Sequence, residues 1–277
     1  FVATAHAVIL NGGKPVFADI DSKTLCIDPK QIRKLITKKT AAILPVHFAG
    51  IACNLNEILH LCQENNVKLI EDAAHAAGTK YDGKRIGSHG MAVCFSFHPV
   101  KNLGMPTGGL ISINHVNHRK LKKTLNEKRW CGITNRHDFT YDVKQVGWNY
   151  YMNEFSAGLG LIQLKKLDKL NRIRRNIAKR YYNEIELEQK MPYVAGSSYH
   201  FYWIITRNRD EIMQRLKQNG IETGIHYKPI HKMSMYNAKK KLPVTENVGK
   251  KIISLPTHPN LSDKDVTRVI SLVNKFL

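Results

Sequence analysis

Short apolar runs alternate with amphipathic segments in the first half of the chain. The runs predict buried strands over residues 41–46, 67–70, 91–97 and 110–113. Between the first two, Leu55, Ile58, Leu59 and Cys62 recur at the spacing of one helix face, which predicts an amphipathic helix over residues 54–65. Because strands that alternate with helices form mostly parallel sheets, we predict an α/β fold with a mostly parallel central sheet flanked by helices.

The second half of the chain begins with helical patterns and then repeats the alternation. Residues 117–130 and a long segment from Asn153 are typical of helices, and residues 131–152 between them are rich in loop-forming residues. Further on, the pattern predicts two strands and a helix, at residues 200–206, 221–227 and 209–218. These elements predict a second, smaller α/β unit.

Ser262 precedes the last amphipathic segment and has the character of a helix N-cap. The inward face of this helix is formed by Val266, Val269, Ile270 and Val273. We therefore predict two domains, a large one over residues 1–175 and a small C-terminal one over residues 176–277.

The charge of the chain is strongly positive, with 43 Lys and Arg against 22 Asp and Glu and a formal net charge of +21. This surplus favours anionic partners, although the basic residues are spread along the chain, as they are in a lysine-rich proteome. The five cysteines show no CxxC spacing, which argues against a zinc site or a disulfide framework and favours the cytoplasm. We expect no metal, nucleic acid or membrane as partner, since no nucleic-acid-binding motif or membrane-length apolar run is found.

Asp72 and Lys101 each follow one of the predicted strands of the first half. Ligands of such sheets bind outside the carboxyl ends of the strands, so we expect the two side chains to lie together. A lysine amine can form a Schiff base with an aldehyde cofactor, and an aspartate can keep the cofactor's ring nitrogen protonated. The pair therefore indicates an enzyme that uses pyridoxal phosphate (PLP).

Six ordered motifs extend this interpretation over the whole chain. They are Phe1-Val2-Ala3-Thr4, Pro45-Val46-His47-Phe48-Ala49-Gly50, Glu71-Asp72-Ala73-Ala74-His75, Ser96-Phe97-His98-Pro99-Val100-Lys101-Asn102, Gly147-Trp148-Asn149-Tyr150 and Gly224-Ile225-His226-Tyr227. With them the chain resembles the DegT/DnrJ/EryC1/StrS family of sugar aminotransferases. The resemblance implies a fold-type I PLP-dependent transferase. It would move an amino group, with glutamate as the expected donor, to a keto group of a nucleotide-activated deoxysugar.

The resemblance also implies roles for residues around the cofactor. Lys101 would form the internal aldimine and then act as general acid and base. Asp72 would pair with the pyridinium nitrogen, Ala74 would let the ring pack on the backbone, and Ser96 would donate its hydroxyl to the phosphate. His75 would lie near the phenolic oxygen of the ring, although a histidine that only packs in the core fits the same pattern.

Other roles that the resemblance implies concern the subunit interface and the substrate. Asn149 would reach the cofactor phosphate of a second subunit, which implies a homodimer with shared active sites, whereas a turn-forming asparagine is the alternative. His226, Tyr227 and His231 would help to shape the sugar-nucleotide site, and ordinary core or surface residues are equally compatible with their positions.

Two features keep alternative functions open. In the family, a stretch upstream of Phe1 supplies a phosphate-binding turn and an aromatic residue, and we expect this part of the large domain to be missing, so a catalytically impaired fragment is one alternative. A PLP-dependent sugar dehydratase relative is another, although such relatives carry histidine where this chain has Lys101. Residues 103–107 also depart from the loop that is usual in the family.

Overall fold

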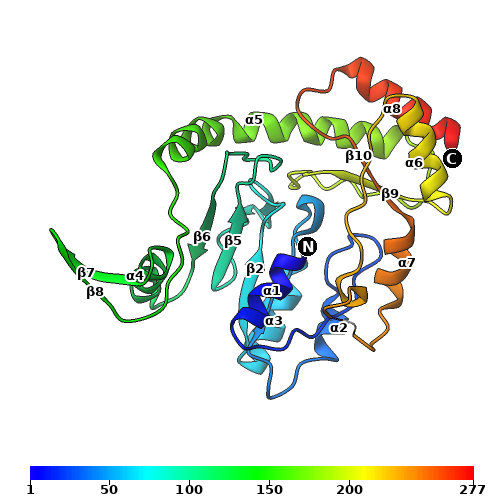
Figure 1. The fold of residues 1–277 in the computed structure, drawn as a ribbon. Helices are drawn as coiled ribbons and strands as arrows, with labels where there is room; N and C mark the ends of the chain where they lie inside the picture. Colours follow the sequence, from blue (N-terminus) through cyan, green and yellow to red (C-terminus); the bar gives the residue numbers. More distant parts are fainter. Residues whose placement is uncertain (237) are drawn as a thin grey trace.

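A computed structural model describes residues 1–236 and 238–277 of the chain (Figure 1). The helices are α1 (Val2–Leu10), α2 (Pro29–Arg33), α3 (Leu55–Asn65), α4 (His118–Arg129), α5 (Glu154–Glu184), α6 (Arg209–Gln218), α7 (Pro243–Lys251) and α8 (Asp263–Phe276), with the 3-10 turns η1 (Phe48–Gly50) and η2 (Ile230–Lys232). The strands are β1 (Ala42–Ile43), β2 (Lys68–Asp72), β3 (Lys80–Tyr81), β4 (Lys84–Arg85), β5 (Ala92–Ser96), β6 (Gly109–Ile113), β7 (Ile133–His137), β8 (Thr140–Val143), β9 (Tyr202–Ile205) and β10 (Ile252–Leu255).

The central sheet has four strands in the order β1-β2-β5-β6. β1, β2 and β5 are parallel, and β6 is antiparallel to β5, with Gly109 opposite Ser96. A parallel neighbour needs a crossover connection, usually a helix, and residues 97–108 contain none, so the chain turns back at this edge. The four predicted strands and the α/β fold class are confirmed.

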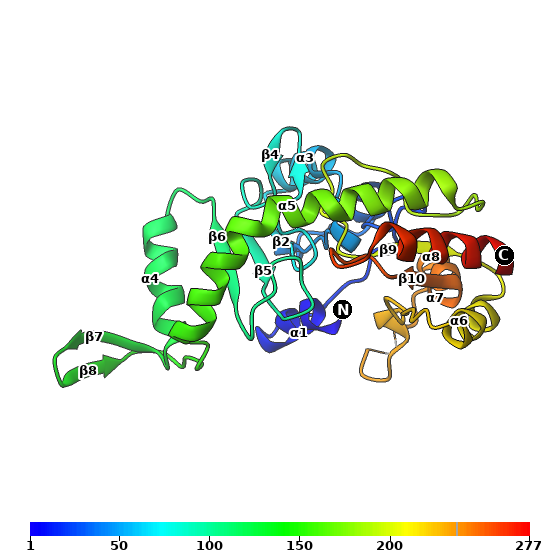
Figure 2. The same ribbon diagram turned by 90° about the horizontal axis from the view of Figure 1, so that it is seen from above.

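Capping side chains begin some of the helices around this sheet. The side chain of Asn54 accepts a hydrogen bond from the backbone of Glu57 and begins α3, whose buried face confirms the predicted helix. Asn153 caps α5 in the same way, and this 31-residue helix runs across the molecule (Figure 2). The boundary at residue 175 lies inside α5, so the division into two domains stays a prediction.

A second, two-stranded sheet pairs β9 with β10 and contacts α6, which in turn contacts α8. The predicted strand over residues 200–206, the helix over residues 209–218 and the helix capped by Ser262 are confirmed. The strand predicted over residues 221–227 is wrong, because β10 takes the place beside β9. All four residues of β10 are buried, while residues 221–227 contribute only an isolated bridge from Gly224 to Ser254.

Residues 131–152, predicted to be loop-rich, contain the hairpin β7–β8, which projects from the body (Figures 1 and 2). Asp138 lies between the two strands with a φ of 49°, a conformation that aspartate tolerates better than most residues. Phe139 beside it is fully exposed. The hairpin therefore lacks core contacts at its tip.

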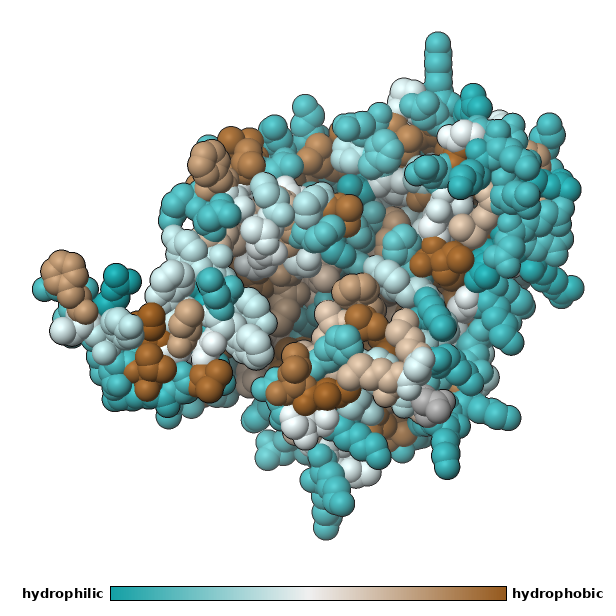
Figure 3. All heavy atoms as spheres, viewed as in Figure 1, coloured by the Kyte–Doolittle hydropathy of each residue, from teal (hydrophilic) through white to brown (hydrophobic). Residues whose placement is uncertain are grey.

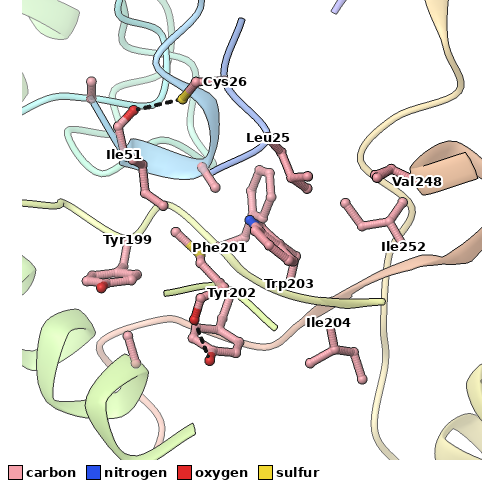
Figure 4. Packing of buried hydrophobic residues seen from close by; sticks show 14 of the residues in the cluster. Leu25, Cys26, Ile51, Tyr199, Phe201, Tyr202, Trp203, Ile204, Val248 and Ile252 are labelled. Atoms are coloured by element: carbon pink, nitrogen blue, oxygen red, sulfur yellow. Dashed lines mark hydrogen bonds between the residues drawn. The ribbon is translucent and has the colours of Figure 1, made fainter. Parts of the chain in front are cut away.

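The largest buried side chains gather around β9, where Trp203 and Tyr202 lie close to Leu25 and Ile252 (Figure 4). The Tyr202 hydroxyl is buried and donates to the carbonyl of Met191 at 2.9 Å, which satisfies its polar group inside the core. This cluster joins residues from both halves of the chain. Within the described residues, no helix is long and apolar enough to cross a membrane.

Candidate active site

Asp72, the last residue of β2, has both carboxylate oxygens held by hydrogen bonds. Oδ1 accepts the backbone N–H of Ala74 at 3.0 Å, and Oδ2 accepts the hydroxyl of Thr4 at 2.5 Å. Thr4 lies on α1, so the contact joins this helix to the end of the sheet. Sequence reasoning assigned no role to Thr4, for which the only signal was its place in the first motif.

Lys101 lies in the turn that follows β5, where its backbone N–H donates to the carbonyl of His98 at 2.8 Å. Its side chain is partly buried. Burial lowers the pKa of the Lys101 amine, and the negative charge of Asp72 opposes that shift without cancelling it. Lys101 and Asp72 therefore interact electrostatically, as their positions at neighbouring strand ends predict.

Three histidine rings lie close enough to Lys101 to feel its charge. Burial lowers the pKa of His75, His200 and His226, and the positive charge of Lys101 lowers each further. The rings of His75 and His200 stack with centroids 4.5 Å apart. The site therefore holds neutral imidazoles beside a potential cation.

The segment that contains His226 and Tyr227 approaches this cluster from the second half of the chain. The Tyr227 hydroxyl lies 3.3 Å from Nε2 of His75, and burial, aided by the charge of Asp72, raises the pKa of Tyr227 to about 12. Nδ1 of His226 lies 2.8 Å from the Ser254 hydroxyl. Tyr227 thus keeps its proton at neutral pH and can act as a hydrogen-bond donor.

Asn102, next to Lys101, is buried and ties the lysine turn to the rest of the molecule. Its Nδ2 donates to Oδ1 of Asn171 on α5 and to the carbonyl of Ser198, both at 2.8 Å. Its Oδ1 lies 3.0 Å from Nδ1 of His200. An amide oxygen can only accept a hydrogen bond, so His200 carries its proton on Nδ1. Sequence reasoning missed Asn102 and His200.

Of the other predicted site residues, Ser96 lies at the end of β5, and Asn149 and His231 lie elsewhere. Ser96 ends β5, and its oxygen accepts the backbone N–H of His98 at 3.4 Å, which leaves the hydroxyl proton for another acceptor. Asn149 is exposed and pairs through its backbone with Trp130, apart from the cluster of this protomer. His231 is buried, with Nε2 3.1 Å from Oε1 of Glu246, and this contact does not join it to the cluster.

The residues present fit PLP by their chemistry. Asp72 offers a fixed carboxylate, Lys101 an amine with lowered pKa, and Ser96 a hydroxyl, all at the ends of adjacent strands. Nδ1 of His75 is buried with no hydrogen-bond partner among the described residues, as expected beside a polar ligand atom. Ala74 is small and half-buried. Figure 3 shows the molecular surface hollowed over β5.

Known proteins of one family match this chain over nearly its whole length. The model of the DegT/DnrJ/EryC1/StrS aminotransferase family matches residues 1–274. Spore coat polysaccharide biosynthesis protein SpsC of Bacillus subtilis is 33% identical, with 100% of this chain and 77% of SpsC covered.

Solved structures show the same fold. PseC of Helicobacter pylori, an aminotransferase of pseudoaminic acid biosynthesis, has a TM-score of 0.92 at 31% identity, covering 100% of this chain and 77% of PseC. Spr1654 of Streptococcus pneumoniae, solved in its PLP form, has a TM-score of 0.92 at 26% identity, covering 100% of this chain and 79% of Spr1654.

Proposed function

Because this chain belongs to the DegT/DnrJ/EryC1/StrS aminotransferase family, we propose that it moves an amino group, from glutamate as the donor, to a keto group of a nucleotide-activated deoxysugar, with PLP bound at Lys101. The observation that carries the proposal is the Lys101 amine, with its lowered pKa, in the field of the doubly held Asp72 carboxylate. PLP, when bound, supplies an aldehyde carbon and an electron-withdrawing ring.

Asp72 would hold the ring nitrogen in its protonated form. An ionised carboxylate opposite a ring N–H stabilises the positive charge there, and this charge draws electrons from the reacting carbon. The donors from Thr4 and Ala74 hold both oxygens and fix the plane of the carboxylate. Ser96 would bind the phosphate, and Ala74 and His75 would contact the ring.

Lys101 would be both the attachment point and the proton carrier. Its Nζ would take a proton from the substrate carbon and return it to the neighbouring carbon of the cofactor. A free lysine amine is protonated at neutral pH, so burial helps by lowering the pKa of Lys101. The neutral rings of His75 and His226 add no positive charge of their own at neutral pH.

His226 and Tyr227 would contact the sugar, because they approach the Lys101 cluster and Tyr227 retains a proton to donate. The contact between His231 and Glu246 supports an indirect role, in which His231 orders the segment that follows Tyr227. Lysine rather than histidine at position 101 supports transamination over sugar dehydration.

The partner subunit in this proposal is a second copy of the chain. The first half of α5 exposes large apolar side chains that a monomer would leave in water: Phe155, Leu159, Leu161, Ile162 and Leu164. Apolar residues also gather on the visible face of the lobe that carries α4 and the hairpin (Figure 3). Such patches mark interfaces. In this dimer the exposed Asn149 would reach the other subunit's cofactor phosphate.

The test combines the purified chain with PLP, glutamate and a panel of UDP-, dTDP- and GDP-linked keto sugars. Formation of 2-oxoglutarate together with an aminated sugar supports the proposal, and Lys101→Ala must abolish both. Loss of a sugar hydroxyl without transfer of nitrogen would support a dehydratase instead.

A further inference from the structure

A buried pair of a histidine and a glutamate lies behind Asp72, on the other face of β2. The side chains of His47 and Glu71 are both 0% exposed, and Nε2 of His47 lies 2.8 Å from Oε2 of Glu71. Successive residues of a strand point to opposite faces of the sheet, so Glu71 projects away from the candidate active site. Burying a carboxylate costs free energy unless its oxygens are hydrogen-bonded, and the proposed reaction makes no direct use of this one.

The hydrogen bonds around the pair determine which atoms donate. The backbone N–H of Cys53 donates to Nδ1 of His47 at 3.1 Å, so the ring carries its proton on Nε2 and donates it to Oε2 of Glu71. Oε1 of Glu71 accepts the backbone N–H of Gly90. Both oxygens of the Glu71 carboxylate are therefore held, by residues from two separate segments of the chain.

Gly90 leaves the space that the Glu71 carboxylate occupies. A Cβ atom at position 90 would lie 2.7 Å from Oε1 of Glu71 and 3.0 Å from the carbonyl oxygen of Leu69, which is too close for a side chain. The carbonyl of Gly90 in turn accepts Nδ2 of Asn114 at 3.0 Å. The chain thus packs closely around this carboxylate just before β5, the strand that lies beside β2 and leads to Lys101 (Figure 1).

His47 also holds the backbone of Asp72 itself. Its N–H donates to the carbonyl of Asp72 at 3.0 Å, and the N–H of Asp72 donates to the carbonyl of Pro45 at 2.9 Å. The regular pairing of β1 with β2 ends at Leu69, so on this side Asp72 is held by an isolated bridge. The ring of His47 contacts Glu71 while its N–H contacts Asp72, and one residue thereby fixes both.

We propose that His47 and Glu71 are positioning residues that fix the end of β2, so that the Asp72 carboxylate meets the ring nitrogen of the cofactor. The inference rests on the proposed function, because it gives the pair a role toward PLP. Thr4 and Ala74 orient the side chain of Asp72, whereas the pair fixes the backbone from which this side chain projects. A displacement of about 1 Å at a reacting group can cost on the order of a hundredfold in rate, so the position of this backbone matters as well.

Glu71→Gln tests the pair with almost no change of volume. The amide oxygen can accept one of the two N–H donors, and the amide NH2 then faces the other, so the end of β2 should shift. PLP titration should give an affinity about tenfold weaker. Nitrogen NMR of PLP labelled at its ring nitrogen should show a loss of the protonated form. Glu64→Gln, in the exposed pair with His60 on α3, makes the same substitution and should match the wild type in both measurements.

Two further comparisons separate positioning from a general effect on folding. His47→Leu removes the donor to Glu71, and His47→Gln keeps an N–H that can reach Oε2, so His47→Gln should restore most of the PLP affinity that His47→Leu loses. In a double-mutant cycle, Glu71→Gln should change the PLP affinity of the Asp72→Asn variant by about twofold or less, because the role of Asp72 is already lost. An equal loss in both backgrounds, or an unchanged affinity and nitrogen signal in Glu71→Gln, would overturn the proposal.

Measurements on the chain without PLP separate this inference from the proposed function. The backbone amide of Asp72 should exchange its hydrogen faster in Glu71→Gln than in the wild type, and Glu64→Gln should not change the rate. A wild type that binds no PLP would contradict the proposed function, whereas faster exchange at Asp72 would still support the hold of the pair on β2. Equal exchange in Glu71→Gln and the wild type would overturn the positioning role in either case.

Discussion

Thr4 donates its hydroxyl to Oδ2 of Asp72 at 2.5 Å, a contact between residues 68 positions apart in the chain. Together with the N–H of Ala74 on Oδ1, it leaves the carboxylate one orientation. The residue predicted to control the electronics of the cofactor thus depends on a helix that the sequence patterns did not predict.

Replacing Thr4 by Val should weaken PLP binding about tenfold or more, because a hydrogen bond to a charged group contributes about 1.5–3 kcal/mol. Thr4→Ser keeps the hydroxyl and should bind as the wild type does. Titration of each variant with PLP, followed by the cofactor's absorbance, gives the affinities. Equal Kd values for Thr4→Val and the wild type would mean that this contact does not position Asp72.

Asn102→Leu should destabilise the fold by about 2–4 kcal/mol, since the substitution leaves the partners on Asn171, Ser198 and His200 unpaired inside the protein. Urea unfolding measures this change. Asn183→Ala, at an exposed position on the same long helix as Asn171, serves as the control and should change stability little. A similar loss of stability in both variants would contradict the claim that the hydrogen bonds of Asn102 stabilise the fold.

Acid should destabilise the chain through His75 and His200. Burial lowers the pKa of both rings below the ordinary value of 6.5. Below about pH 6.5 the unfolded chain therefore binds more protons than the folded chain, so the free energy of unfolding falls as the pH falls. In urea titrations from pH 7.5 to 5, His75→Gln should flatten this dependence and His118→Gln, on exposed α4, should not.

Exposed apolar residues on α5 should hold the dimer together. Leu161 and Ile162 are 65% and 51% exposed, and replacing both by Glu places charges in the proposed interface. Light scattering should then find the 31.6 kDa protomer where the wild type has twice that mass. The control is Lys38→Glu, at an exposed position. A wild type that is monomeric at micromolar concentration contradicts the shared active site.

Patterns within short stretches of the sequence correctly predicted several helices and strands. The spacing from Leu55 to Cys62 gave α3, Ser262 marked the start of α8, and the ends of two apolar runs placed Asp72 and Lys101. Residues 221–227 also have strand character, but β10 competes for the same neighbour, a choice that no local pattern contains.

The supporting residues of the site depend on contacts that are distant in sequence. Asn102 finds its partners at Asn171 and His200, and Thr4 finds Asp72, so nothing near these residues in the chain signals their roles. Family motifs indicated the chemistry of Lys101, whereas the hydrogen bonds that support it came from the fold.

Borohydride reduction of the PLP-loaded chain, followed by peptide mass spectrometry, tests the central claim most directly. Reduction fixes PLP to the amine that holds it, and we predict a pyridoxyl group on the peptide that contains Lys101, lost in Lys101→Arg. A pyridoxyl group only on another lysine, or on none, would contradict the account of the site.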